Sequence, residues 1–220
     1  MKPVRQPLSR RRIVLAALAL TEKDGLPGVT MRSVAASLQV TPMSLYNHVA
    51  DKAELLDLML DYVLGDVVRA SQHDVGTWDE RLGAVARRYH ELWKRHPVFA
   101  QVYVHGVTVG PYGLANMERI LGILREAGFD DADAAAAFSV VRHFCVASML
   151  VGPVRPVDRS KRGSRSDGSR QGRIDTYFSA LPVDEIPNVA RSATFLGSDS
   201  FEFGLEVLLA GLRARVTKSG

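Results

Sequence analysis

Three helix starts lie between Thr30 and Asp51, and this spacing limits what the chain can fold into. Thr30, Thr41 and Asp51 are residue types that cap helix N-termini, and Pro42 suits a first helical position because its missing N–H needs no partner there. The pattern predicts a short helix at 31–38, another that begins at Pro42, and a longer one after Asp51. Helices of about two turns are unstable alone, so these must pack against one another.

Apolar residues recur at helical spacing along most of the chain, and in the first 70 residues nothing alternates with the period of a strand over a useful length. The sequence therefore predicts an all-α fold. It has an N-terminal three-helix helix-turn-helix domain at 1–52, a connecting helix at 53–70 and a larger C-terminal helical domain at 71–220. The expected helices cover about 10–24, 31–38, 42–48, 51–70, 78–95, 98–105, 112–127, 131–150 and 200–216.

The net charge of +4 is unevenly distributed. Residues 1–12 carry five basic side chains and no acid, and residues 155–173 carry seven basic side chains against two acids. The rest of the chain is acidic, so a basic N-terminal arm predicts an anionic partner such as nucleic acid. Residues 153–185 read as a loop, and the Gly- and Ser-rich part at 160–173 is predicted to be disordered. It is either a solvated connector or a segment that contacts a partner or DNA.

Several classes of function lack their sequence signatures. There is no GxSxG, no HExxH, no Gly-rich phosphate loop and no pair of cysteines for zinc, and the histidines do not recur at metal-ligand spacing. We therefore expect no enzyme activity, no cofactor and no metal site. The single cysteine, Cys145, excludes an internal disulfide and fits a reducing cytoplasm. No apolar run approaches the length of a membrane span, which favours a cytoplasmic protein.

The short helix that begins at Pro42 presents small and flat polar groups, and it follows a compact turn at 38–41. In a helix-turn-helix, the second crossing helix enters the major groove of DNA. Met43 and Ser44 near its start are expected to reach base edges, and Tyr46 and His48 to contact phosphates. The full set of expected DNA contacts is Thr30, Arg32, Thr41, Pro42, Met43, Ser44, Tyr46, Asn47, His48 and Lys52.

The segment GVTMRSVAASLQVTPMSLYNHVADKAELLDLMLDYV resembles the DNA-binding domain of TetR-type bacterial repressors. Gln39 departs from the pattern, because the family usually has Gly in this turn. A left-handed Gln would cost roughly 1 kcal/mol relative to Gly. The residues that match in order are Thr30, Arg32, Ala35, Leu38, Leu45, Tyr46, His48, Lys52 and Leu55.

The end of the chain, FEFGLEVLLAGLRARV, resembles the closing helix of the tetracycline-repressor branch. The resemblance implies a homodimer through the helices at about 131–150 and 200–216, and a repressor bound to a palindromic double-stranded DNA operator. Gly204 and Gly211 lie on one helical face and allow another helix to approach closely. The alternative is that this face packs only within one chain.

The resemblance also implies a small-molecule inducer that releases the DNA. In an alignment with the tetracycline repressor, His and Asn that contact the drug correspond to Val67 and Val85 of this chain. This difference argues against tetracycline as the inducer and for a different compound. The alternative function is a ligand-independent or partner-controlled DNA-binding protein that uses the C-terminal domain only to dimerise. Candidate ligand-binding residues are Trp93, Tyr103, His105, Thr108, Met117, His143 and Phe144.

Overall fold

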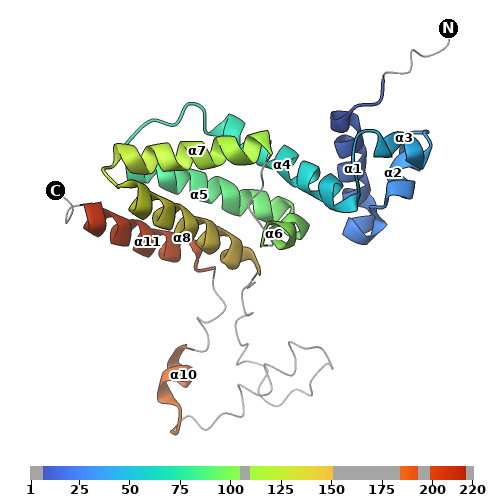
Figure 1. The fold of residues 1–220 in the computed structure, drawn as a ribbon. Helices are drawn as coiled ribbons and strands as arrows, with labels where there is room; N and C mark the ends of the chain where they lie inside the picture. Colours follow the sequence, from blue (N-terminus) through green and yellow to red (C-terminus); the bar gives the residue numbers. More distant parts are fainter. Residues whose placement is uncertain (1–6, 105–109, 151–183, 193–198, 217–220) are drawn as a thin grey trace. The chain divides into compact units, whose positions relative to one another are not determined.

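The protein is represented by a computed structural model that describes residues 7–104, 110–150, 184–192 and 199–216. Within these ranges the regular structure is entirely α-helical, as predicted (Figure 1). The helices are α1 (Arg10–Gly28), α2 (Met31–Ser37), α3 (Pro42–Tyr46), α4 (Lys52–Ala70), α5 (Trp78–Arg95), α6 (Pro97–Val104), α7 (Pro111–Glu126), α8 (Asp131–Leu150), α10 (Pro187–Ser192) and α11 (Phe201–Val216).

The chain divides into two compact units, one formed by residues 1–150 with 208–220 and the other by residues 151–207. The described part of the second unit contains α10 and the first turns of α11. The sequence did not predict α10. Most of the loop expected at 153–185, including its basic segment at 160–173, lies outside the described residues.

The helices α2, α3 and α4 begin directly after the predicted capping residues Thr30, Thr41 and Asp51. Thr30 forms a capping box with Ser33, because the Thr30 hydroxyl accepts from the Ser33 N–H at 3.0 Å and the Ser33 hydroxyl accepts from the Thr30 N–H at 2.9 Å. Thr41 accepts from the Ser44 N–H at 3.3 Å. Apolar side chains from α1, α2 and α3 then form a common core, which includes Ile13, Ala17, Val34, Ala35, Leu45 and Val49.

Two helix ends differ from the prediction. The regular part of α1 breaks at Gly25, whose φ of 69° is not helical, and one further turn extends to Gly28. The helix α3 ends at Tyr46 and not at His48, because the His48 N–H donates to the Leu45 carbonyl at 2.8 Å and tightens the chain into a turn. The expected helical face at 42–48 is therefore a short helix followed by a turn.

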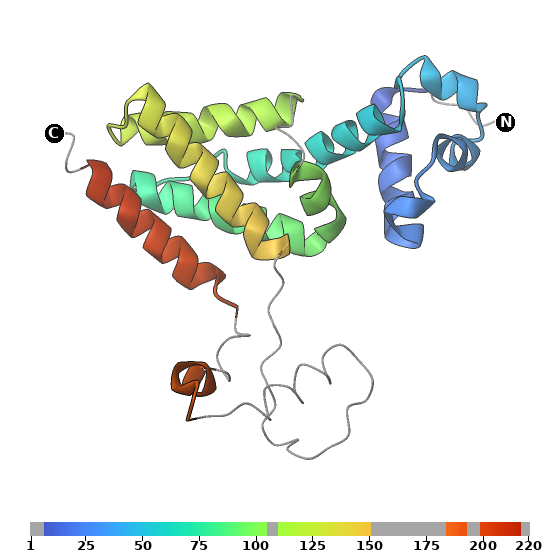
Figure 2. The ribbon, with the colours of Figure 1, turned by 60° about the horizontal axis from the view of Figure 1, so that its bottom comes forward.

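The helix α4 runs from the N-terminal helices into the larger group formed by α5–α8 (Figures 1 and 2). It packs against α1 at its start and against α7 further along, while α8 packs against α5, α6 and α7. The last turns of α11 are joined to this group by ion pairs of Arg213 with Asp79 and of Arg215 with Asp133. The largest fully buried side chains of the group include Trp93, Phe99, Leu82, Leu92, Ile123 and Leu124.

Among the described residues, α8 is the one helix long and apolar enough to cross a membrane by length and composition alone, although no run of this length was expected from the sequence. Core helices of water-soluble proteins also meet these two criteria. Only 28% of its most apolar window is buried. Much of this apolar helix is thus left uncovered by the described part of the chain.

Candidate DNA interface and ligand cavities

The helix α3 is anchored on one side and open on the other. Leu45 is fully buried, and Val49 in the following turn is 1% exposed, so both hold α3 against its neighbours. On the opposite side Met43 is 73% exposed and Tyr46 is 49% exposed. Of the other predicted contacts in this segment, Thr41, Pro42 and Asn47 are exposed, and Ser44 and His48 are partly buried.

Exposed side chains flank α3 on both sides. Thr30 and Arg32 lie at the start of α2, and Lys52 is the first residue of α4. All three are exposed, and the Thr30 hydroxyl is also the group that caps α2. The first turn of α4 also offers backbone N–H groups beside Lys52, an arrangement suited to a phosphate.

Arg10 has a structural contact that the sequence analysis did not assign. Its Nε donates to the His48 carbonyl at 2.8 Å, and its guanidinium pairs with Glu54 at 3.1 Å. The Glu54 carboxylate also accepts from the Ala50 N–H. This arginine of the basic arm therefore fixes the turn after α3.

The turn between α2 and α3 contains the strained residue that the sequence suggested. Gln39 has a φ of 57° and is the one residue other than glycine with a positive φ in the described ranges. Its N–H donates to the Ala36 carbonyl at 3.1 Å, and the Val40 N–H donates to the Ala35 carbonyl at 3.0 Å. The turn keeps the geometry for which the family uses Gly, at the expected conformational cost.

An aromatic cluster occupies the centre of the C-terminal helices. Trp93 is fully buried, with ring centroids 5.2 Å from Tyr103 and 5.9 Å from Tyr89. The Arg142 guanidinium lies 5.7 Å from the centroid of Tyr103. Burial raises the pKa of the Tyr103 hydroxyl and raises that of Tyr89 well above its ordinary value, so both groups are neutral. Burial also raises the pKa of the nearby Cys145 thiol to about 12.

The cavity in this cluster is almost closed. Its volume is about 10 Å³, which is room for roughly one water molecule. The indole N–H of Trp93 is buried and finds no acceptor among the residues that the structure describes. The lining residues are Tyr89, Trp93, Tyr103, Ile120, Phe138, Val141, Arg142 and Cys145.

The predicted ligand-binding residues are only partly brought together. Trp93 and Tyr103 line the closed cavity, whereas Met117, His143 and Phe144 do not. Met117 and Phe144 are partly buried, and His143 is exposed, because these three side chains lie on other faces of α7 and α8. His105 and Thr108 lie outside the described residues.

Four polar or aromatic lining groups are not among the residues predicted from the sequence. A usable signal existed for Tyr89, which lies four residues before Trp93 and so shares its helical face. Phe138, Arg142 and Cys145 lie at the same kind of spacing on α8. Nothing local shows that these two faces meet each other.

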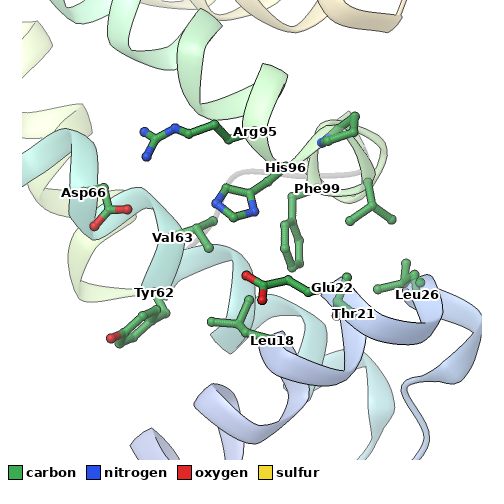
Figure 3. A pocket seen from close by; sticks show the side chains of 13 residues that line it. Leu18, Thr21, Glu22, Leu26, Tyr62, Val63, Asp66, Arg95, His96 and Phe99 are labelled. Carbon is green, nitrogen blue, oxygen red and sulfur yellow. The ribbon is translucent and has the colours of Figure 1, made fainter.

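A larger cavity of about 320 Å³ lies where α1, α4 and the junction of α5 with α6 meet (Figure 3). This cavity was not predicted from the sequence. Its lining side chains come from three segments that are far apart in the chain, so no local pattern marks them. They are Leu18, Thr21, Glu22, Leu26, Tyr62, Val63, Asp66, Arg95, His96, Pro97, Val98 and Phe99, with Gly25 beside them.

Comparison with known proteins places these features in a family. Residues 13–59 match the description "Bacterial regulatory proteins, tetR family", and residues 70–216 match "Tetracyclin repressor-like, C-terminal domain". The HTH-type transcriptional repressor DrrR1 of Streptomyces coeruleorubidus is 32% identical over 99% of this chain and 83% of its own length.

Solved structures agree with the sequence matches. Apo ActR from Streptomyces coelicolor superposes with a TM-score of 0.80 at 30% identity, covering 98% of this chain and 99% of ActR. ActR in complex with actinorhodin gives 0.80 at 32% identity, covering 96% and 99%. With both halves of the chain matched, this protein belongs to the TetR family of bacterial transcriptional regulators.

Proposed function

We propose that the protein is a homodimeric repressor that binds a palindromic operator and is released from it by a small-molecule inducer. The observation that carries this proposal is the exposed side of α3, where Met43 and Tyr46 project from a helix anchored by Leu45. A short helix held in this way suits insertion into the major groove, with α2 across the backbone. Membership of a family of DNA-binding regulators supports the same reading.

The flanking side chains divide the DNA contacts into two kinds. Met43 and Ser44, at the N-terminal end of α3, reach base edges or thymine methyl groups. Tyr46, Lys52 and the segment around His48 contact phosphates, which position the protein without reading sequence. Thr30, Arg32, Thr41, Pro42 and Asn47 complete the proposed interface.

The proposed dimer forms through α8 and α11. On α8, Val140 is 51% exposed and Leu150 is 44% exposed; on α11, Phe203 is 72% exposed and Val207 is 57% exposed. Large apolar side chains at this exposure are candidates for cover by a second copy. Such a dimer would place two copies of α3 about one turn of DNA apart, roughly 34–36 Å, to meet successive major grooves.

The inducer is proposed to enter the aromatic cluster around Trp93. The unpaired indole N–H and the Arg142 guanidinium supply polar contacts, and Tyr89 and Tyr103 supply flat apolar surface. The volume of the cavity is only about 10 Å³, so a ligand can enter only if the cavity widens. A bound ligand would therefore favour a conformation other than the one described. ActR has been solved with actinorhodin and with (S)-DNPA, which makes these two compounds the first to test.

The test is a gel shift with DNA from around the protein's own gene, run at two salt concentrations. We expect retarded bands that weaken at higher salt and that disappear when actinorhodin or (S)-DNPA is added. A Trp93→Phe variant should still bind DNA but respond less to the compound. Specific binding that no compound relieves would favour the ligand-independent or partner-controlled alternative, and absence of DNA binding would refute the proposal.

A further inference from the structure

We propose that the cavity between α1, α4 and the α5–α6 junction is a second ligand site, which takes a compound with an apolar ring and one basic nitrogen. It is separate from the aromatic cluster around Trp93, with which it shares no lining residue. The binding itself does not depend on the function proposed above. Only its effect on DNA binding rests on that function.

The size and walls of this cavity fit a small ring compound. Its volume of about 320 Å³ lies at the lower end of the range for small-molecule sites. Leu18 and Leu26 from α1, Val63 from α4 and Phe99 from α6 supply its apolar lining (Figure 3). Val63 and Phe99 are almost fully buried, so the apolar base of the cavity is fixed by the core.

The Glu22 carboxylate is the group that selects a cation. It lines the cavity, is exposed at the cavity's edge, and has no hydrogen-bond or salt-bridge partner among the described residues. The other acid, Asp66, already pairs with Arg69 at 2.5 Å. A basic nitrogen placed beside Glu22 would therefore complete an ion pair without displacing an existing one.

The remaining polar groups do not oppose a cation. Figure 3 shows the His96 ring and the Glu22 carboxylate pointing toward one another, while the Arg95 side chain extends to the side where Asp66 lies. Burial and the Arg95 charge lower the pKa of His96, against the opposing effect of Asp66 and Glu22, so the ring is neutral at pH 7.5. A neutral imidazole can exchange a hydrogen bond with a bound amine without repelling its charge.

The position of this site gives it a way to regulate. Its walls come from α1, which belongs to the DNA-binding end, and from α5 and α6, which belong to the C-terminal helices. A ligand that contacts both sides binds best at one angle between them and so biases the placement of α3. By reciprocity, operator DNA must change the affinity of the site by the same factor.

The experiment titrates the full-length protein with 1-naphthylmethylamine and with 1-naphthylmethanol, its neutral counterpart of the same shape, by calorimetry at pH 7.5. We expect saturable binding of the amine that is about threefold tighter than binding of the alcohol, because only the amine gains an ion pair and the exposure of Glu22 to water weakens that pair. Glu22→Gln should remove most of this difference and leave the alcohol unaffected. Glu118→Gln changes an exposed acid on α7, outside the cavity lining, and should alter neither titration.

The proposed site would be overturned by any one of three results. These are equal affinity for the two compounds, the same preference for the amine in Glu22→Gln as in the wild type, and no saturable binding of the amine. A Leu18→Trp variant adds volume inside the cavity and should abolish both titrations. If it binds both compounds like the wild type, they bind elsewhere and the proposal fails. A gel shift repeated with the amine tests regulation separately. If the protein binds the amine but no DNA, the repressor function is refuted and the proposed ligand site is not.

Discussion

Asp61 is a buried acid that joins the DNA-connecting helix α4 to the start of α7. It is 7% exposed, and its carboxylate accepts from the Gly113 N–H at 2.8 Å and from the Tyr112 N–H. The cap residue of α7, Gly110, has no side chain to satisfy these groups. A Cβ at Gly110 would lie 2.2 Å from the Asp61 carboxyl carbon, so Gly at this position permits the contact. One side chain on α4 thus caps a distant helix.

The effect of removing this cap follows from two opposing contributions. Two hydrogen bonds to a charged acceptor are worth about 3 kcal/mol together, at roughly 1.5 kcal/mol each. The loss of hydration on burial of the carboxylate offsets part of this free energy. The same burial is the main reason why the pKa of Asp61 is raised. Because Asp61→Ala leaves two backbone N–H groups without partners, it should lower the free energy of unfolding by about 2 kcal/mol. Asp61→Asn keeps one acceptor and should cost about 1 kcal/mol.

Equilibrium unfolding in urea, followed by circular dichroism at one fixed protein concentration, measures these differences. The matched control is Asp57→Ala, an exposed acid on the same helix, which should change the free energy of unfolding by less than about 0.5 kcal/mol. If Asp61→Ala were as mild as the control, the carboxylate would not cap α7 and the reasoning would be wrong.

The pH dependence gives an independent check of the same contact. A raised pKa means that the folded protein holds the Asp61 proton at pH values where the unfolded chain, with a pKa near 3.8, has released it. This group therefore adds stability as the pH falls through its folded-state pKa toward 3.8, and the addition is absent at neutral pH. The wild type should gain stability relative to Asp61→Asn over that interval. A constant difference across it would show that burial does not perturb the carboxyl.

Three further predictions concern the DNA-binding helices. Lys52→Ala should weaken binding to all DNA sequences alike and lower the slope of log affinity against log salt by about 1, measured by titrations at several salt concentrations. Met43→Ala or Ser44→Ala should instead change which DNA sequences the protein selects from a randomised operator library, and should leave the slope of log affinity against log salt unchanged. Gln39→Gly should raise the free energy of unfolding by up to about 1 kcal/mol in urea, since φ at this position is 57°; a loss of stability would contradict the strain.

The sequence by itself determined the local architecture. The caps at Thr30, Thr41 and Asp51 and the helical spacing of apolar residues located the helices to within a few residues, because both signals act over one or two turns. The same local rules identified the helix-turn-helix, whereas the left-handed conformation at Gln39 was suggested by the resemblance to TetR-type repressors, which usually have Gly there. They overextended α3, because nothing in its residue types separates a last helical turn from the tighter turn that follows Tyr46.

Only the tertiary structure decided which distant side chains meet. The cap from Asp61 to α7, the aromatic cluster around Trp93 and the cavity beside Glu22 each join segments separated by tens of residues. Several candidate ligand residues fell outside the cluster because the face of α8 that turns inward is the one carrying Arg142 and Cys145. Helix periodicity defines an apolar face but not its partner, since the crossing of two helices depends on how all their side chains interlock.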